Sequence, residues 1–442
     1  MMFLSPVVLF AAAACAFPID FNSKPYDQQA LDQFNVLRFL GTASPYVQQP
    51  GHGIDPDVPY GCELEQVVFI ARHGERYPTK SKGESIEKGL KRIRYNITDD
   101  LNGPLSFLPS YDFSGLDPER YDDETFKGPY AGLGDMYKFG EAFRNTYDHL
   151  VSDDADDLVF YTASQERVVV SARKFAEGFL GKKIDNSSLV IIDEDDENLG
   201  ANSLTPITSC RNYNKTLNDD LIDTLSDDYL KTTAKRLNKE TPGLNLTTKE
   251  VEALFNYCGF DLTTAGKSAI CEIFTTDELL ARSYANDVDY YYHKGPGYNL
   301  SVPVGSVFVN AVIDLFKDDT RNLTMTFAHD TDIFFIVSTL GIYDGELPLD
   351  HQSFNHLWKV SNINPMGSRL IFEKLQCSNE SYVRVKHNDA VIPITSISSG
   401  PGYSCTVDEF EKYIEDRLNG VTYAEACGNP DDLPAELNFL LD

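Results

Sequence analysis

The chain has 442 residues, of which 42% are hydrophobic and 12% aromatic, so it can form a sizeable core and is not expected to be disordered. Acidic residues outnumber basic ones by 68 to 38, which gives a formal net charge of −30 at pH 7. A protein this acidic is not expected to bind nucleic acid or anionic membranes. The length predicts two or more domains, or one large fold with an insertion.

The first sixteen residues have the pattern of a secretory signal peptide. An apolar stretch without acidic residues ends in the small-residue run Ala14-Cys15-Ala16, although the usual basic start is missing. No later segment is apolar and long enough to span a bilayer. We therefore expect a secreted, soluble protein in which residues 17–60 form an N-terminal arm.

Short apolar or β-branched runs recur along the chain, and each leads into a turn or a helical pattern. After the second run, Ser164 is a candidate N-cap for a helix that Gly181 would end. Strands that alternate with helices predict an α/β fold with a mostly parallel central sheet flanked by helices. The predicted strands are residues 67–71, 158–162, 189–192, 323–328, 370–374 and 382–385.

The strand pattern fades between residues 204 and 294, where helical pieces at 219–237 and 248–257 are separated by glycine and proline. We interpret 204–294 as a helical insertion domain. The α/β domain would then comprise 61–203 and 295–442. Within it, residues 80–150 are expected to be rich in loops and to contribute in part to the helical domain. The acidic run 193–197 is expected to be a solvated loop.

A histidine between two arginines follows the first predicted strand, in the run Arg72-His73-Gly74-Glu75-Arg76. Ligands of open α/β sheets bind at the carboxyl ends of the strands. Two guanidinium groups there would bind a tetrahedral oxyanion through paired, charge-assisted hydrogen bonds. The run therefore predicts a phosphate site with a nucleophilic histidine.

A second histidine ends the 323–328 strand, followed directly by a carboxylate, as His329-Asp330-Thr331-Asp332. A third cation, Arg167, falls in the first turn of the helix that follows the 158–162 strand. The N-terminus of a helix disfavours a cation, and a bound phosphate would reverse that penalty.

These motifs resemble the histidine acid phosphatases, and closely the secreted yeast and fungal members that include phytases. The resemblance implies that His73 attacks phosphorus and forms a phosphohistidine, and that Asp330 protonates the leaving alcohol. It also implies that Arg72, Arg76, Arg167 and His329 hold the phosphoryl oxygens, without a metal or other cofactor. The matching stretches are residues 71–78, 128–133, 167–178, 203–206, 295–297, 328–330 and 400–405.

The chemistry of these residues fits an acidic medium. The arginines beside His73 disfavour its imidazolium form, which keeps one ring nitrogen available for attack. Asp330 must start protonated, which predicts a pH optimum of about 4–5. Glu75 and Asp332 are expected to lie next to the phosphate-binding residues, without contacting the phosphate, and to orient basic side chains.

The residues after the first motif bear on the substrate. The run Thr79-Lys80-Ser81-Lys82-Gly83 is similar to a segment of fungal phytases, in which the lysine matching Lys82 contacts a phosphate outside the scissile position. The resemblance therefore favours phytate, myo-inositol hexakisphosphate. Three alternatives stay open: an acid phosphatase of broad specificity, an enzyme of the phosphoglycerate mutase type, and a non-catalytic secreted wall glycoprotein.

Seven cysteines remain once Cys15 leaves with the signal peptide, and in an oxidising compartment they predict three disulfides and one free thiol. Cys258 and Cys271 are close in sequence and flank a short loop. The family pattern implies Cys62–Cys377 and Cys210–Cys427, with Cys405 free; the alternative is Cys405–Cys427 with Cys210 free. No cysteine or histidine cluster has zinc-ligand spacing.

Glycosylation and self-association are also expected. Two arrangements are open for the arm, in which Leu31, Phe34 and Leu37 recur at helical spacing: packing on its own domain, or on a neighbour in a homo-oligomer like those of some family members. Seven Asn-x-Ser/Thr acceptors are present, at Asn96, Asn186, Asn214, Asn245, Asn299, Asn322 and Asn379.

Overall fold

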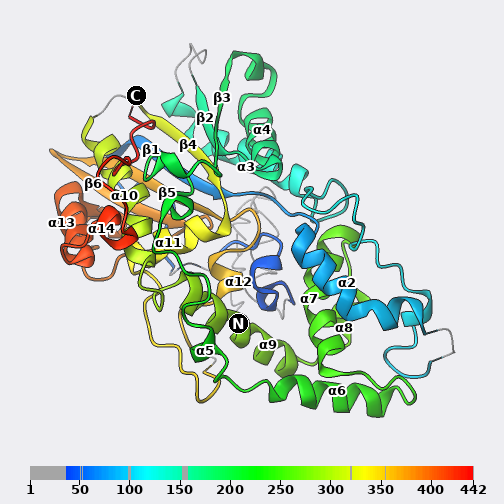
Figure 1. Ribbon diagram of the computed structural model, residues 1–442. Helices are drawn as coiled ribbons and strands as arrows, with labels where there is room; N and C mark the ends of the chain where they lie inside the picture. The colour runs from blue at the N-terminus through cyan, green and yellow to red at the C-terminus, as the bar shows by residue number, and fades with distance from the viewer. Residues whose placement is uncertain are drawn as a thin grey trace, which may run out of the picture. The chain divides into compact units, whose positions relative to one another are not determined.

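The structure is a computed structural model that describes residues 36–49, 51, 53–97, 101–151, 158–318, 321–353 and 355–441. The expected signal peptide, Leu31 and Phe34 lie outside these residues. From Val36 onwards the chain packs as one unit around a single sheet (Figure 1). The strands are β1 (Cys62–Arg72), β2 (Val159–Ala163), β3 (Ser188–Ile192), β4 (Leu323–Ala328), β5 (Arg369–Cys377), β6 (Glu380–His387), β7 (Ala390–Val391) and β8 (Cys405–Thr406).

The strand order is β3-β2-β4-β1-β5-β6-β7, with β8 paired to β6. β3, β2, β4 and β1 run parallel, whereas β5 returns antiparallel to β1 and continues into an antiparallel edge. The six strands predicted from the apolar runs are all present, so the expected α/β fold is confirmed. The parallel half carries both histidine motifs at its carboxyl edge.

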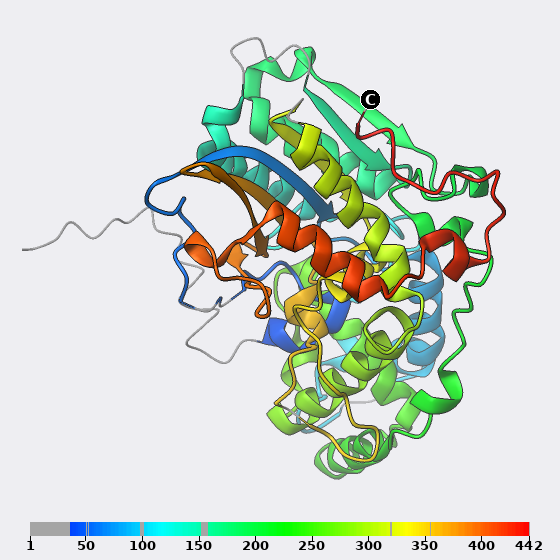
Figure 2. The ribbon, with the colours of Figure 1, turned by 90° about the vertical axis from the view of Figure 1, so that its left-hand side faces the viewer.

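Alternation along β1 divides the core into two layers. Val67, Phe69 and Ala71 face one layer, where Phe69 packs against aromatic rings of two helices, α3 (Gly132–Tyr147) and α4 (Glu166–Leu180). Val68 and Ile70 face the opposite layer. That layer is covered by α10 (Ser301–Asp318), α11 (Asp330–Leu340) and α13 (Val407–Leu418), of which α10 and α13 lie in front of the sheet in Figure 2.

The segment between β3 and α10 contains helices and no strand among the described residues. The separation of 204–294 as a domain of its own remains a prediction. The expected helix at 219–237 is two helices, since a turn at 223–227 interrupts it. The remaining α-helices among the described residues are α2 (Lys80–Tyr95), α5 (Asp219–Ile222), α6 (Asp228–Glu240), α7 (Thr248–Ala265), α8 (Ala269–Glu272), α9 (Thr276–Lys294), α12 (Val360–Ile363) and α14 (Tyr423–Cys427).

Residues 80–150 are not as rich in loops as the sequence suggested, because α2 and α3 each span 16 residues. Their glycines, which imitate a loop composition, allow close packing between helices. A Cβ at Gly140 of α3 would fall on the backbone carbonyl of Phe175 in α4, and one at Gly178 of α4 would fall on that of Tyr137. The two helices therefore contact each other backbone to backbone.

The N-cap expected at Ser164 is also wrong. Gln165 caps α4 without a side-chain hydrogen bond, and the Ser164 hydroxyl instead accepts a hydrogen bond from the backbone N–H of Glu194. Gly181 does end the helix, as its C-cap. Ser164 thus ties the end of β2 to the loop after β3.

Three disulfides are formed in the described part of the chain: Cys62–Cys377, Cys210–Cys427 and Cys258–Cys271. Cys405 is buried as a free thiol, so the alternative bond between Cys405 and Cys427 is not formed. Among the described residues, no helix is long and apolar enough to cross a membrane.

Candidate functional site

The two histidine motifs meet because β1 and β4 are adjacent and parallel. Arg72 pairs in register with Ala328, so the residues that follow them leave the sheet side by side. The backbone N–H of His73 donates to the carbonyl of Ala328, and the ring centroids of His73 and His329 are 6.0 Å apart. The strand-end histidines predicted from sequence therefore share one site.

Three arginines surround the histidine pair. Arg72 is the last residue of β1, Arg76 comes from the loop after it, and Arg167 comes from the first turn of α4. In all three, Nε is buried without a hydrogen-bond partner among the described residues. Burial and the nearby Arg167 and Arg72 cations lower the pKa of Arg76 to about 9. Crowded guanidinium groups with unpaired donors are arranged to receive an anion.

Backbone carbonyls hold the Arg72 guanidinium in place. Its Nη1 donates to the carbonyl oxygens of Thr42 and Asn364, at 2.9 and 2.7 Å. Asn364 also donates its side-chain amide to the carbonyl of Asp330. One residue therefore fixes both Arg72 and the start of α11.

The tautomer of His73 follows from a hydrogen bond of its ring. Nδ1 lies 2.9 Å from the carbonyl oxygen of Gly74, which can only accept, so Nδ1 carries the proton. Nε2 is then the nitrogen with a free lone pair. Burial, together with the charges of Arg72, Arg167 and Arg76, holds the pKa of His73 well below its usual value. A neutral, nucleophilic imidazole is thus favoured even in acid.

Asp330 is the first residue of α11, and its Oδ2 lies 3.9 Å from Nη2 of Arg72. Burial alone would raise the pKa of this carboxyl, but Lys294 and Arg72, followed by His329 and Arg76, lower it below its ordinary range. Lys294 ends α9 and donates to the Thr331 hydroxyl at 2.7 Å. Without a bound anion, Asp330 is therefore held as a carboxylate.

His329 is oriented by Glu194, a residue that the sequence analysis had placed in a solvated loop. Glu194 is buried, and both of its oxygens lie 3.1 Å from Nε2 of His329. Nδ1 of His329 faces Nη2 of Arg167 at 3.4 Å. Glu194 lies two residues after the end of β3, so it follows the carboxyl end of a strand, as His73 and His329 do.

The two acids expected to orient basic groups contact the backbone instead. Glu75 is fully buried and accepts the backbone N–H of Tyr46 at 2.7 Å. Asp332 accepts the backbone N–H of His329 at 3.2 Å, as a cap of α11. Burial raises the pKa of both carboxyls, further supported at Glu75 by the charge of Asp135. Glu75 and Asp332 therefore favour the neutral, protonated form and are poorly suited to act as counterions of the basic groups.

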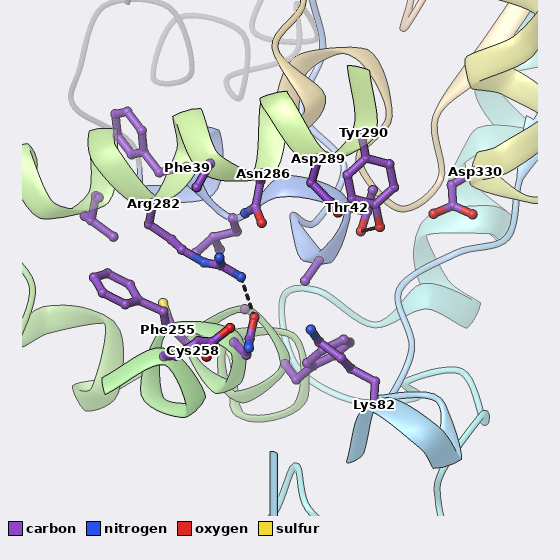
Figure 3. Close-up of a pocket in the computed structure, with 18 of the residues that line it drawn as sticks. Phe39, Thr42, Lys82, Phe255, Cys258, Arg282, Asn286, Asp289, Tyr290 and Asp330 are labelled. Carbon is purple, nitrogen blue, oxygen red and sulfur yellow. Dashed lines mark hydrogen bonds between the residues drawn. The ribbon is translucent and has the colours of Figure 1, made fainter. Parts of the chain in front are cut away.

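A cleft with a volume of about 470 Å³ opens in front of Asp330 (Figure 3). Lys82 from α2 and Arg282 from α9 lie on opposite sides of it. Arg76 lines the same cleft. Burial and the neighbouring Arg282 charge lower the pKa of Lys82, whereas Glu252 and Asp289 act in the opposite direction. The cleft therefore offers cations beyond the arginines that surround His73.

The N-terminal arm forms part of this cleft, which the sequence analysis did not anticipate. Phe39, Leu40, Thr42 and Ala43 line it, and the Thr42 hydroxyl lies 3.0 Å from that of Tyr290 on α9. Leu37 is buried in a short 3₁₀ helix, Val36–Phe39, that contacts α9 and α12. The described part of the arm thus packs on its own chain.

Arg282 and Lys294 were missed because each lies in a helix without a motif that marks it, although Lys294 directly precedes the Gly295-Pro296-Gly297 run. Among the described residues, no group of three or more His, Cys, Asp or Glu side chains could hold a metal ion. The chemistry that this cluster of cations supports is the binding of a phosphoryl group.

Known proteins resemble the chain over most of its length. A family model described as the histidine phosphatase superfamily (branch 2) matches residues 63–388. A phytase of Candida albicans is 39% identical over 426 residues, which cover 94% of this chain and 92% of the relative. The constitutive acid phosphatase of Saccharomyces cerevisiae is 39% identical over 414 residues, which cover 89% and 87%.

The structural comparison agrees. The phytase from D. castellii matches with a TM-score of 0.88 at 38% identity, over 95% of this chain and 93% of the other. A multiple inositol polyphosphate phosphatase of Bifidobacterium longum matches with a TM-score of 0.66 at 15% identity, over 85% and 97%, which is a likeness in fold alone.

Proposed function

Because the chain belongs to branch 2 of the histidine phosphatase superfamily, we propose that it is an acid phosphomonoesterase that works through a phosphohistidine at His73. The observation that carries this proposal is that three arginines, whose Nε atoms have no partner among the described residues, surround a neutral histidine whose Nε2 bears the free lone pair. Phosphoryl transfer depends on positioning and on neutralisation of charge, which these groups provide. Relatives named acid phosphatase and phytase support the same activity.

The reaction has two steps. The lone pair of His73 Nε2 forms a bond to phosphorus while the ester P–O bond breaks, and the leaving oxygen takes the proton of Asp330. Water then attacks the phosphohistidine, gives a proton to the Asp330 carboxylate, and releases phosphate and free His73. Arg72, Arg76, Arg167 and His329 hold the phosphoryl oxygens throughout.

Substrate binding is expected to supply the protonated state of Asp330. Of the four cations that lower its pKa in the free enzyme, Arg72, His329 and Arg76 are ones that a phosphate dianion would neutralise. Low external pH acts in the same direction, so an optimum of about pH 4–5 is expected. A profile that peaks at neutral pH would contradict the assignment of Asp330 as the acid.

Two substitutions test the mechanism. His73→Ala should abolish turnover of every phosphomonoester. Asp330→Asn should slow substrates with poor leaving groups by roughly 10²- to 10⁴-fold, but aryl phosphates much less, because activated leaving groups need no proton. Phosphate release from glycerol phosphate and from p-nitrophenyl phosphate is the measurement. EDTA should leave both rates unchanged, and residual His73→Ala activity at the wild-type level would exclude the phosphohistidine.

Phytate is the substrate we favour, since Lys82 and Arg282 can contact phosphates that are not being cleaved. Lys82→Ala and Arg282→Ala should each raise the KM for phytate severalfold, about 1 kcal/mol per lost charge contact, and should barely change p-nitrophenyl phosphate kinetics. High salt should reduce the difference. Equal effects on both substrates, or negligible phytate hydrolysis, would favour the alternative of a broad-specificity acid phosphatase.

The proposal also includes that the protein is secreted, carries N-linked glycans and forms a homo-oligomer. Six of the acceptors, all but Asn186, have exposed asparagines, and the side chain of Asn186 lies outside the described residues. A mass decrease on endoglycosidase treatment of the secreted protein would test occupancy. Light scattering of the deglycosylated protein, with and without residues 17–45, would test the homo-oligomer.

A further inference from the structure

The backbone at Gly74 controls the orientation of His73. The carbonyl oxygen of Gly74 accepts the Nδ1 proton of His73, which leaves Nε2 free for attack. The N–H of Gly74 belongs to the peptide group that joins it to His73. A rotation at Gly74 would therefore change both the direction and the tautomer of the ring.

Two side chains hold the Gly74 N–H. Oε1 of Glu124 accepts it at 2.9 Å, and the hydroxyl of Ser171 on α4 lies at the same distance. Glu124 Oε1 and the Ser171 hydroxyl are also hydrogen-bonded to each other. Glu124 and Ser171 are both buried, so water does not offer the N–H an alternative acceptor.

The segment that carries Glu124 is itself hydrogen-bonded to the loop that follows β1. Glu124 forms an antiparallel bridge with Arg76, and the N–H of Thr125 donates to the carbonyl of Glu75 at 2.8 Å. Tyr77 donates its N–H to Asp123 on the other side of the bridge. Backbone pairing on both sides of Glu124 therefore fixes its position next to Gly74.

We propose that Glu124 is a positioning residue that holds Gly74, and through it the ring of His73, in the orientation required for attack on phosphorus. This inference rests on the proposed phosphohistidine mechanism. Glu124 acts as a hydrogen-bond acceptor, and its negative charge is not required. An ionised carboxylate here would face Arg167 and Glu75 and would weaken the attraction of the site for phosphate.

The electrostatics of the position agree with that role. Burial raises the pKa of Glu124 to about 8, despite the hydrogen bonds from Ser171 and Gly74 and the charge of Arg167. At acidic pH the side chain is therefore neutral. Its Oε2 has no partner among the described residues, so a neutral amide of the same shape can replace the acid without breaking a hydrogen bond.

Rapid-quench measurement of phosphohistidine formation tests the proposal, with p-nitrophenyl phosphate as substrate. Glu124→Met removes the acceptor at similar length and should slow phosphohistidine formation on the order of ten- to a hundredfold, because small misplacements of a nucleophile are costly. KM should change by less than about twofold, since the phosphate ligands are untouched. Glu124→Gln should restore the rate to within about threefold of wild type, because the amide oxygen still accepts.

Ser171→Ala and Glu119→Leu complete the set. Ser171→Ala leaves one acceptor for Gly74 and should have a smaller effect than Glu124→Met, and the double variant should lose more than either. Glu119 is exposed on the same segment, so Glu119→Leu should behave as wild type. Rates are expressed per active site from the burst amplitude, so that partial unfolding of one variant does not imitate slow chemistry.

Three results would overturn the proposal: a wild-type rate in Glu124→Met, a rise in KM with an unchanged rate, or a loss in Glu124→Gln as large as in Glu124→Met. Absence of a phosphohistidine in the wild-type enzyme would instead refute the proposed mechanism itself. The two failures are therefore distinguishable in one experiment.

Discussion

Asp330 has to meet two opposing demands. As a general acid it must carry a proton when the substrate is bound, yet Lys294, Arg72, His329 and Arg76 favour its carboxylate in the free enzyme. Three of these cations are assigned to the phosphate, and binding of the substrate offsets their charge. Lys294 hydrogen-bonds Thr331 instead, so its effect on Asp330 should persist in the complex.

Removal of the Lys294 charge should therefore shift the pH profile. In Lys294→Met, the pKa of Asp330 is expected to rise, so the protonated acid persists to higher pH and the alkaline limb of kcat moves upward. The measurement is kcat for glycerol phosphate between pH 3 and pH 8. Lys412→Met, an exposed lysine on α13, is the control and should leave the profile unchanged. A shift toward lower pH would show that Lys294 does not act on Asp330.

The sequence predicted the residues that follow strands and missed those held by tertiary contacts. His73, His329 and Asp330 follow apolar runs, so the pattern located them directly. Glu194 follows a strand as well, but its acidic neighbours resemble a solvated turn. Arg282 lies within a helix, where a basic residue is usually exposed, and only the cleft that α9 lines together with α2 and α7 gives it a role.

At the level of helices and strands, β-structure was easier to predict than helix boundaries. Buried parallel strands are continuous apolar runs, which the sequence displays openly. The helical pattern of α2 and α3 was hard to recognise because both contain glycines, and glycine lowers the helix propensity of a segment. The structure explains them: Gly83 lies against the Tyr121 ring, Gly89 against Ala253, and Gly140 against the backbone of α4.

Two glycines of α3 provide a matched test of this explanation. Gly140→Ala should destabilise the protein by about 1–3 kcal/mol, because the added methyl group overlaps the carbonyl of Phe175 in α4. At Gly134 the nearest atom to an added Cβ is 3.8 Å away, so Gly134→Ala should be neutral or stabilising by up to ~1 kcal/mol. Urea unfolding followed by circular dichroism measures both. Equal midpoints would mean that the glycines do not permit the packing of α3 on α4.

Two groups of carboxyls across the molecule respond to pH in opposite directions. Burial raises the pKa of Glu75, Glu124 and Asp332, with nearby acids adding to the effect at Glu75 and Asp332. At Glu250, Glu278 and Glu373, burial alone would also raise the pKa, but salt bridges to Arg92, to Arg236, and to Arg384 and Lys386 lower it. The net charge of −30 adds a general repulsion that grows as the pH rises.

These opposing groups predict maximal stability in mild acid. A buried carboxyl with a raised pKa binds its proton more tightly in the folded state, so its contribution is complete below the ordinary carboxyl pKa and is lost as pH rises towards the folded value, about 8 for Glu124. The salt-bridged carboxyls contribute above their unfolded pKa, and their contribution is lost as pH falls below about 4. The thermal midpoint should therefore peak near pH 5 and decline towards pH 8.

Scanning calorimetry of the wild type and of Glu124→Gln measures this decline, which should be shallower in the variant because an amide does not titrate. Added salt should weaken the part of the decline that arises from net charge. The difference in slope between the wild type and Glu124→Gln should remain, since buried groups are poorly screened. A midpoint that rises from pH 5 to pH 8, or an identical slope in Glu124→Gln, would show that the buried acids are not neutral in the folded protein.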